Sequence, residues 1–293
     1  MGDQCRRDLG NYDAARKLYE GLLARYPEST QAMRAQRGIV NIDIKAGNYE
    51  AAEAGVKTIL ARYANHDDLP QAFYWLGNDY LNARQDDKAA QCYQYVIDNR
   101  PDSNAVMSSW AGMGRVHVRR GDDQAALDVI DMMITDFNDN PEVATAVFQI
   151  GEEYYNRAYG ELNQGRQLDS EESFRGAIRV WERVISETPN ANSTTMAHAH
   201  YFSALCHREL GDRGKAIEYF QETVSRWPGY RFSWNAQFLI ARSFEELVRR
   251  KEIPPGDAAV MIRYACQEII TEYPDCLAVK AAGDMLKRWN SVN

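Results

Sequence analysis

The sequence has few cysteines, and none of them has the spacing that redox or metal sites use. Five cysteines occur among 293 residues, an odd number, and no Cys-x-x-Cys is present. We therefore expect free thiols that behave as small hydrophobic side chains, rather than a disulfide framework. Long hydrophobic runs are missing as well, so no stretch of the sequence is expected to span a bilayer.

The sequence also lacks the motifs of common nucleotide-binding and hydrolytic sites. It has no Gly-x-x-x-x-Gly-Lys-Ser/Thr, no His-Glu-x-x-His and no Gly-x-Ser-x-Gly. The tightest cluster of possible metal ligands runs from His198 to His207. On a helix, however, His198 and His200 would point about 200° apart. We expect no enzyme, no cofactor and no metal site, and we keep a metal-dependent enzyme as an alternative that metal analysis would test.

Positive charge is in deficit: the sequence has 34 Lys and Arg residues and 42 Asp and Glu residues, which gives a formal net charge of -8. Nucleic-acid binding that is driven by charge needs a basic face. The composition therefore argues against nucleic acid as a partner.

A short phrase, in contrast, is repeated along the chain. The segment GNYDAA begins at Gly10, and GNYEAA begins at Gly47. Aligned on the second alanine of the phrase, four positions follow one another at intervals of 37 residues and three more follow at wider steps: Ala15, Ala52, Ala89, Ala126, Ala177, Ala216 and Ile262. Four residues further on, the side chain is large or apolar in every copy: Tyr19, Val56, Tyr93, Ile130, Trp181, Phe220 and Cys266.

Turn and stop signals surround the same positions. Glycine precedes them at Gly10, Gly47, Gly121 and Gly211, and proline often lies twelve residues after them, at Pro27, Pro101, Pro189, Pro228 and Pro274. Proline cannot continue a helix, and small residues let two helices approach closely. Each unit is therefore predicted to be a helix, a short turn, a second helix and a stop.

The repeat resembles the tetratricopeptide repeat and its W-x2-L-G-x2-Y…A-x3-F…P pattern. The third unit shows the pattern in Leu76, Gly77, Tyr80, Ala89, Tyr93 and Pro101, and the sixth in Ala204, Gly211, Ala216, Phe220 and Pro228. The resemblance implies an all-α, right-handed superhelical solenoid of about seven helical hairpins with a C-terminal capping helix. The expected repeats are residues 1–29, 30–66, 67–103, 104–141, 142–192, 193–230 and 231–275, with the capping helix in 276–293.

Two repeats are longer than the others, and the first is shorter. The extra residues lie near 158–173, interpreted as two lengthened helices with a turn near Gly165, and near 248–258. The short first repeat suggests a piece of a longer natural protein. The phrases ARYPEST, SRWPGY and TEYPDC are similar to repeat endings in bacterial cell-envelope scaffolds. This resemblance favours a periplasmic or cell-envelope location, with the cytoplasm as the alternative.

In such a stack the first helices of the hairpins are expected to line a concave surface. The residues predicted to face a partner there are Arg34, Arg37, Asn41, Tyr74, Asn78, Arg115, Arg119, Phe148, Tyr155, Tyr201, Arg208, Phe238 and Arg242. Arginine forks bind carboxylates, and arginine and tyrosine dominate binding hot spots. We therefore predict a non-catalytic scaffold that binds a peptide or partner protein with acidic groups in this groove, with Arg115, Arg119 and Tyr201 as its energetic centres. The alternative is an assembly component that acts through its ends or its convex face.

Overall fold

The computed structural model describes residues 11–29 and 31–292, and in these residues the regular elements are fourteen α-helices. The predicted turn at Gly10 lies outside the described residues. Second helices of the hairpins carry even numbers: α2 Tyr12–Arg25, α4 Tyr49–Tyr63, α6 Asp86–Asn99, α8 Asp123–Asp136, α10 Gln167–Glu187, α12 Arg213–Arg226 and α14 Pro255–Glu272. First helices carry odd numbers: α3 Ala32–Lys45, α5 Leu69–Asn82, α7 Val106–Arg120, α9 Val143–Asn163, α11 Ser193–Glu209 and α13 Ser233–Arg249, followed by α15 Val279–Trp289.

The turns within the hairpins depend on left-handed backbone. Gly47, Gly121 and Gly211 have φ of 76°, 78° and 83°, a region that glycine adopts without steric cost. The third and seventh hairpins use Arg84 (φ 60°) and Lys251 (φ 61°) instead. The turn geometry is thus the same even where the glycine signal is missing from the sequence.

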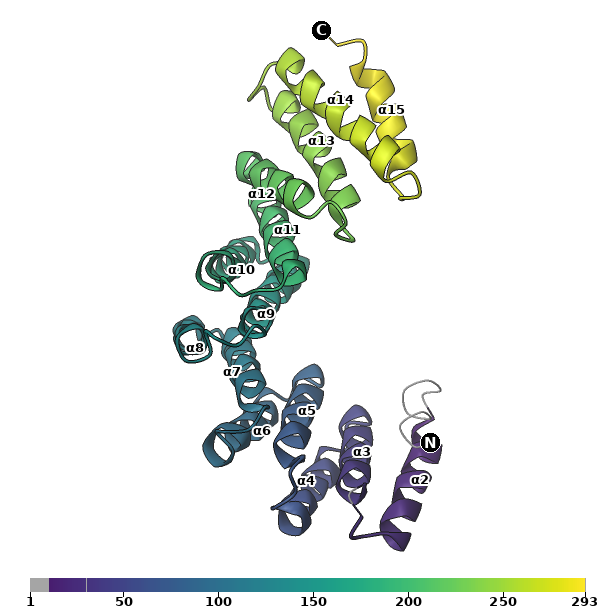
Figure 1. Ribbon diagram of the computed structural model, residues 1–293, viewed down its shortest axis with the longest axis vertical. Helices are drawn as coiled ribbons and strands as arrows, with labels where there is room; N and C mark the ends of the chain where they lie inside the picture. The colour runs from purple at the N-terminus through teal and green to yellow at the C-terminus, as the bar shows by residue number, and fades with distance from the viewer. Residues whose placement is uncertain (1–10, 30, 293) are drawn as a thin grey trace. The chain divides into compact units, whose positions relative to one another are not determined.

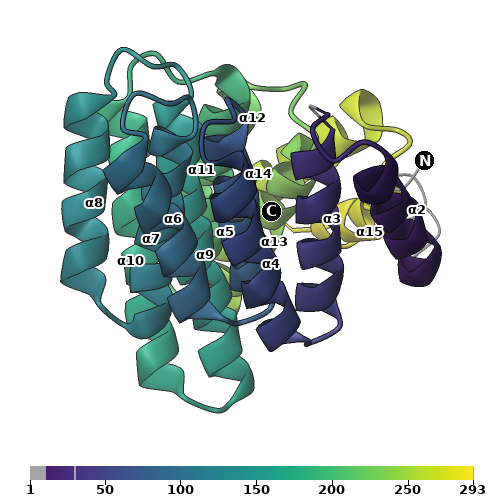
Figure 2. The same ribbon diagram turned by 90° about the horizontal axis from the view of Figure 1, so that it is seen from below.

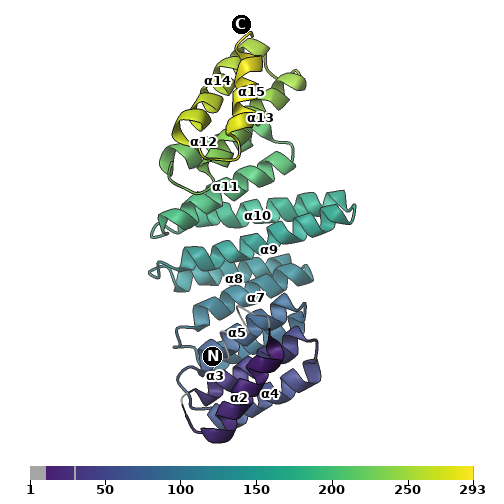
Figure 3. The same ribbon diagram turned by 90° about the vertical axis from the view of Figure 1, so that its right-hand side faces the viewer.

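The extra residues near 158–173 lengthen two helices, as their sequence indicates. Helices α9 and α10 have 21 residues each. They are joined by a turn at Gly165, whose φ is 74°. Figure 3 shows the two helices lying side by side over their length. The insertion therefore extends an existing hairpin and adds no new element.

The aligned position of the repeat is buried in the second helix of each hairpin. All seven of its residues are 0% exposed: Ala15, Ala52, Ala89, Ala126, Ala177, Ala216 and Ile262. Six of the seven are alanine, whose small side chain lets the neighbouring helix approach closely, and the seventh is the larger Ile262.

The described chain divides into two compact units, residues up to Val129 and residues from Ile130 onward. In unit 1, helices α2 to α7 form antiparallel hairpins that contact the next hairpin along the chain (Figure 1). Figure 2 shows its purple and blue helices roughly side by side, with short turns at both ends. Each unit is a stack of helical hairpins, which confirms the predicted all-α repeat solenoid.

Tyr93 is the central side chain of unit 1. It is 0% exposed, and its hydroxyl donates to Asn78 Oδ1 at 2.8 Å. Its ring lies between two glycines, since a β-carbon added at Gly77 or at Gly112 would be 2.4 Å from a ring atom. The ring is thus held from two helices, α5 and α7, at once.

In unit 2, Trp181 is a buried aromatic residue of a second helix that packs against a glycine, as Tyr93 does in unit 1. It is 0% exposed, and its Nε1 donates to the Phe148 carbonyl at 3.2 Å. Gly151 provides the space, because a β-carbon there would lie 2.3 Å from Nε1. Aromatic side chains thus join the first and second helices in both units.

We expect alkaline pH to destabilise the fold because buried tyrosines hold their protons. Burial raises the pKa of Tyr80 and Tyr93 and raises the pKa of Tyr201 to about 12. In an unfolded chain the pKa is near 10, so the folded state binds more protons above that pH and its stability falls as pH rises. The expected loss is on the order of 1 kcal/mol for each of these tyrosines by pH 11.

Urea unfolding at pH 8, 10 and 11 measures this loss, and absorbance at 295 nm follows tyrosine ionisation. An unfolding midpoint that does not move between pH 8 and pH 11 would contradict the prediction.

Candidate functional site

Two predicted binding arginines of α3 lie against the next hairpin. Arg34 pairs with Asp68 at 2.5 Å, and both side chains are about half exposed. The guanidinium of Arg37 lies 4.6 Å from the centre of the Trp75 ring, a cation–π arrangement. Both arginines are therefore already in contact with α5 or the turn before it.

Arg119 on α7 connects two repeats. Its side chain is 11% exposed, pairs with Asp86 at 3.1 Å and donates to the Leu81 carbonyl. A glutamate at this position would bring a second carboxylate next to Asp86 in a partly buried place, which is destabilising. Arg115, on the same helix, is half-buried, and its charge lowers the pKa of Tyr93 against the larger opposite effect of burial. Replacing both Arg115 and Arg119 by glutamate would therefore change the stability of unit 1, and a loss of binding in that variant could not be assigned to the groove alone.

The remaining predicted residues of unit 1 are polar groups with structural partners. Asn41 is 2% exposed and so lies in the core, not on the surface predicted for it. Asn78 accepts the hydrogen bond from the hydroxyl of Tyr93. Tyr74 is half-buried, with its ring centre 6.3 Å from that of Tyr93. Asn78 and Tyr74 thus contribute to the packing between neighbouring helices of unit 1.

Two predicted aromatic residues of unit 2 are in the core as well. Phe148 and Tyr201 are each 6% exposed. Phe148 stacks on Trp181 with ring centres 5.4 Å apart, and the Tyr201 hydroxyl donates to Asn235 Oδ1 at 2.8 Å. Tyr155 is half-buried in the same aromatic cluster. Neighbouring repeats cover these rings, so the structure places Phe148 and Tyr201 away from the face that their register predicted.

The last three predicted residues do come together. Arg208 on α11 and Phe238 and Arg242 on α13 line one hollow of about 350 Å³. We call it the arginine hollow; its lining residues are Arg208, Glu209, Arg213, Phe238, Leu239, Arg242, Ser243 and Glu246. It lies within unit 2, on the first helices of the sixth and seventh hairpins.

An internal ion pair fixes one wall of the arginine hollow. Arg213 Nε lies 2.6 Å from Glu246 Oε2, and the Arg213 side chain also donates to the Arg208 carbonyl. The hydrogen bond from Arg213 holds the pKa of Glu246 below its usual value. Arg208 pairs with the adjacent Glu209 at 3.3 Å. Two of the three arginines thus have carboxylate partners inside the hollow.

Arg242 and Ser243 differ from the rest of the lining. Arg242 is exposed, and its side chain makes no ion pair or hydrogen bond within the part of the chain that the structure describes. Ser243 is 1% exposed, and its Oγ has no hydrogen-bond partner among the described residues. A buried hydroxyl without a partner is costly, on the order of 1–3 kcal/mol. A positive charge and an unused hydroxyl therefore lie next to each other beside Phe238.

The histidines of α11 have structural contacts. His200 is 1% exposed, with Nδ1 2.9 Å from the Met196 carbonyl oxygen and Nε2 3.0 Å from Glu222 Oε2. Burial lowers the pKa of His198 and His207. Over residues 11–29 and 31–292, no three His, Cys, Asp or Glu side chains are arranged to hold a metal ion.

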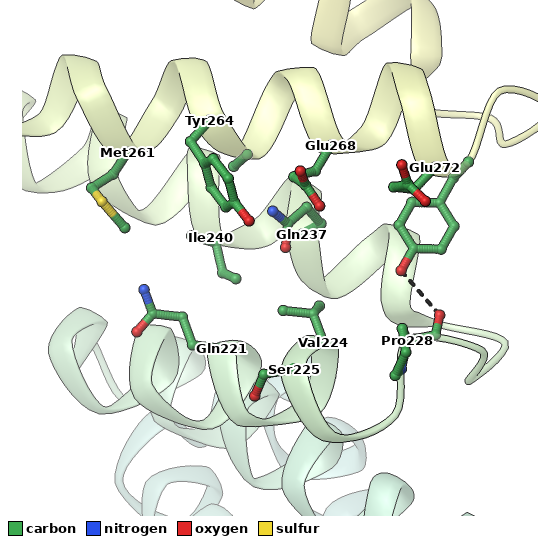
Figure 4. A pocket seen from close by; sticks show the side chains of 12 residues that line it. Gln221, Val224, Ser225, Pro228, Gln237, Ile240, Met261, Tyr264, Glu268 and Glu272 are labelled. Atoms are coloured by element: carbon green, nitrogen blue, oxygen red, sulfur yellow. Dashed lines mark hydrogen bonds between the residues drawn. The ribbon is translucent and has the colours of Figure 1, made fainter.

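A second hollow was not predicted from the sequence. It has a volume of about 430 Å³ and lies between the second helices α12 and α14, with α13 behind it (Figure 4). We call it the glutamate hollow; its lining residues are Gln221, Val224, Ser225, Pro228, Gln237, Ile240, Met261, Tyr264, Ala265, Glu268, Glu272 and Tyr273. Its lining includes Tyr264 in the middle of α14, an aromatic residue that the structure leaves 58% exposed and that the sequence analysis did not single out.

Comparison with known proteins identifies the repeat. Three family models, each described as tetratricopeptide repeat, match residues 6–74, 71–103 and 155–231. The chain is a tetratricopeptide repeat protein. Among solved structures, the C-terminal part of a tetratricopeptide repeat-containing protein from Cytophaga hutchinsonii has a TM-score of 0.52 and 16% identity, covering 97% of this chain and 98% of that one. A tetratricopeptide repeat protein from Parabacteroides merdae has a TM-score of 0.48 and 13% identity, covering 97% and 94%.

A curated relative of this tetratricopeptide repeat protein is the protein CTR9 homolog of Arabidopsis thaliana. The two are 22% identical over 225 residues, which is 76% of this chain and 19% of the relative. The chain thus spans about a fifth of the length of that relative. Tetratricopeptide repeats typically form non-catalytic scaffolds that bind other proteins, and this chain has the fold of such a scaffold. The predicted cell-envelope location stays a prediction.

No described helix combines the length and the hydrophobicity that a bilayer crossing requires.

Proposed function

We propose that this tetratricopeptide repeat protein is a non-catalytic scaffold and that the arginine hollow binds an acidic segment of a partner protein. The observation that supports this most directly is the pair formed by Arg242, an exposed arginine without a carboxylate partner, and Ser243, a buried hydroxyl without an acceptor. Both groups can donate to a carboxylate. Together they offer one carboxylate a positive charge and a second hydrogen-bond donor.

The lining of the arginine hollow supports the same choice of ligand. Arg213 and Glu246 neutralise each other, as do Arg208 and Glu209, so the guanidinium of Arg242 is the unbalanced charge. Phe238 adds an apolar, half-buried surface beside it. An acidic side chain next to an apolar one fits this pattern, because the carboxylate meets the arginine and the apolar group meets the ring.

A binding titration with matched peptides tests the proposal. The probe is an acetylated, amidated pentapeptide with one central glutamate flanked by leucines, and the control peptide has glutamine in its place. Binding is followed by amide and side-chain NMR shifts of the full chain. We expect the glutamate peptide to perturb α11 and α13 and to bind about tenfold more tightly than the glutamine peptide, since a hydrogen bond to a charged group contributes about 1.5–3 kcal/mol.

Charge reversal at Arg242 completes the test. The variant Arg242→Glu is expected to lose the glutamate peptide, whereas Arg25→Glu, an exposed arginine on α2, is expected to bind it like the wild type. Equal affinity of the wild type and Arg242→Glu for the glutamate peptide would show that the peptide does not bind in the arginine hollow. Function would then belong to the ends of the array or to its convex face, as the alternative from the sequence has it.

A further inference from the structure

The glutamate hollow lies on the other side of α13 from the arginine hollow. Ile240 lines the first and Arg242 lines the second. Ile240 and Arg242 are two residues apart on α13, and at about 100° per residue their side chains point about 200° apart, in nearly opposite directions. The two hollows are therefore separate surfaces, and occupation of one leaves the other accessible.

Gln237 forms an acceptor at the back of the glutamate hollow. The residue is 5% exposed, and its Oε1 has no hydrogen-bond partner in the described chain. Figure 4 shows its amide end among the lining side chains, between Tyr264 and Glu268. A buried amide oxygen without a donor is a costly arrangement that a bound donor would relieve.

Two carboxylates at the mouth of the hollow lack a cation. Glu268 and Glu272 are one turn apart on α14, and neither side chain has an ion pair or hydrogen bond among the residues that the structure describes. Like charges at this spacing destabilise a helix by about 0.2–0.5 kcal/mol. They also occupy the C-terminal end of α14, where the helix dipole favours positive charge and where no basic residue is present.

Most of the remaining lining is apolar or aromatic, and Gln221 and Ser225 on α12 add two uncharged polar side chains. Val224 on α12 and Ile240 on α13 form the floor, and Met261 and the 58% exposed Tyr264 project from α14 (Figure 4). Among the described lining residues there is no lysine, arginine or histidine. Such a hollow accepts hydrogen bonds and positive charge but also offers a surface for a hydrocarbon chain and a ring face for a cation.

The two walls of the hollow are tied together at one end. The Tyr273 hydroxyl, after α14, donates to the Pro228 carbonyl, after α12, at 3.0 Å. The same kind of bond joins Tyr63 to the Pro27 carbonyl in unit 1. This bond ties the segments that follow α12 and α14 to each other at one end of the hollow.

We propose that the glutamate hollow binds an arginine side chain of a partner protein. The guanidinium would pair with Glu268 and Glu272 and donate to Gln237 Oε1, while its aliphatic stem lies on Val224 and Ile240. Arginine fits better than lysine, because its planar fork has five donors, stacks on an aromatic ring such as Tyr264 and is more weakly hydrated. This site is independent of the acidic-segment site on the first helices.

An NMR titration of the full chain tests the proposal. The probe is an acetylated, amidated pentapeptide with one central arginine flanked by leucines, and the matched control has citrulline, which keeps the shape and loses the charge. We expect the arginine peptide to shift the side-chain amide signals of Gln237 and the backbone amides of α14. Its dissociation constant is expected to be about tenfold lower than that of the citrulline peptide.

The double variant Glu268→Gln/Glu272→Gln is expected to remove this difference, and Glu20→Gln, an exposed glutamate on α2, is expected to leave it unchanged. Glu20 and Glu272 are exposed and Glu268 is half-buried, and the change to glutamine keeps the size of the side chain, so folding is expected to persist and is checked by circular dichroism. Equal affinities for the two peptides, or shifts confined to other helices, would overturn the proposal. The variant Arg242→Glu should bind the arginine peptide normally, which separates a failure here from a failure at the arginine hollow.

Discussion

Replacement of Tyr93 by alanine is expected to lower the free energy of unfolding by about 3–5 kcal/mol, the range for removal of a large buried ring. The ring is 0% exposed and is held between Gly77 and Gly112. The surrounding helix backbones limit how far the site can collapse, so a cavity would remain. The loss of the ring also leaves Asn78 Oδ1 without its donor.

Urea unfolding followed by circular dichroism measures this effect, and amide hydrogen exchange locates it. Faster exchange is expected in α5, α6 and α7 of unit 1, which contact one another. The matched control is Tyr26→Ala at a residue 63% exposed, for which we expect a change within about 0.5 kcal/mol. Similar losses in both variants would show that Tyr93 is not the centre of this core.

The second large effect is expected from the substitution Gly112→Ala. The added β-carbon would lie 2.4 Å from Tyr93 Cζ, and the ring cannot retreat because Gly77 closes the other side. Overpacking of this kind costs about 1–3 kcal/mol, against a gain of up to about 1 kcal/mol in helix propensity. We expect a net destabilisation of about 1–2 kcal/mol.

The same substitution at Gly21 provides the control with the opposite sign. Gly21 lies in α2, and a β-carbon there would have nothing within 4 Å. Gly21→Ala is therefore expected to raise the free energy of unfolding by about 0.5–1 kcal/mol through helix propensity alone. Thermal and urea unfolding of both variants give the comparison. Stabilisation by Gly112→Ala would contradict the close approach of α7 to Tyr93.

The two proposed hollows give the repeat protein opposite charge preferences on two sides of α13. The arginine hollow has an unbalanced guanidinium, and the glutamate hollow has two unbalanced carboxylates. The crossed peptide experiments separate these sites, because each variant should affect only its own peptide. A scaffold of this kind could hold an acidic and a basic partner segment together.

The repeat itself was determined by the sequence. The seven aligned positions from Ala15 to Ile262 are all 0% exposed, and Gly47, Gly121 and Gly211 all have positive φ. These features depend on contacts within one hairpin, where spacing along the chain fixes which side chains meet. The lengthening of α9 and α10 was predictable for the same reason.

Only the tertiary structure decided which side chains of the first helices reach the surface. Arg119 is held by Asp86, 33 residues earlier, and Tyr201 by Asn235, 34 residues later. Such partners belong to the neighbouring repeat, so helical register alone cannot show that they cover the side chain. The same holds for Arg242, which is distinguished by having no such partner, and for Gln237, whose burial depends on how α12, α13 and α14 pack. Register gives the direction of a side chain, and the next hairpin decides whether that direction leads to solvent or to the core.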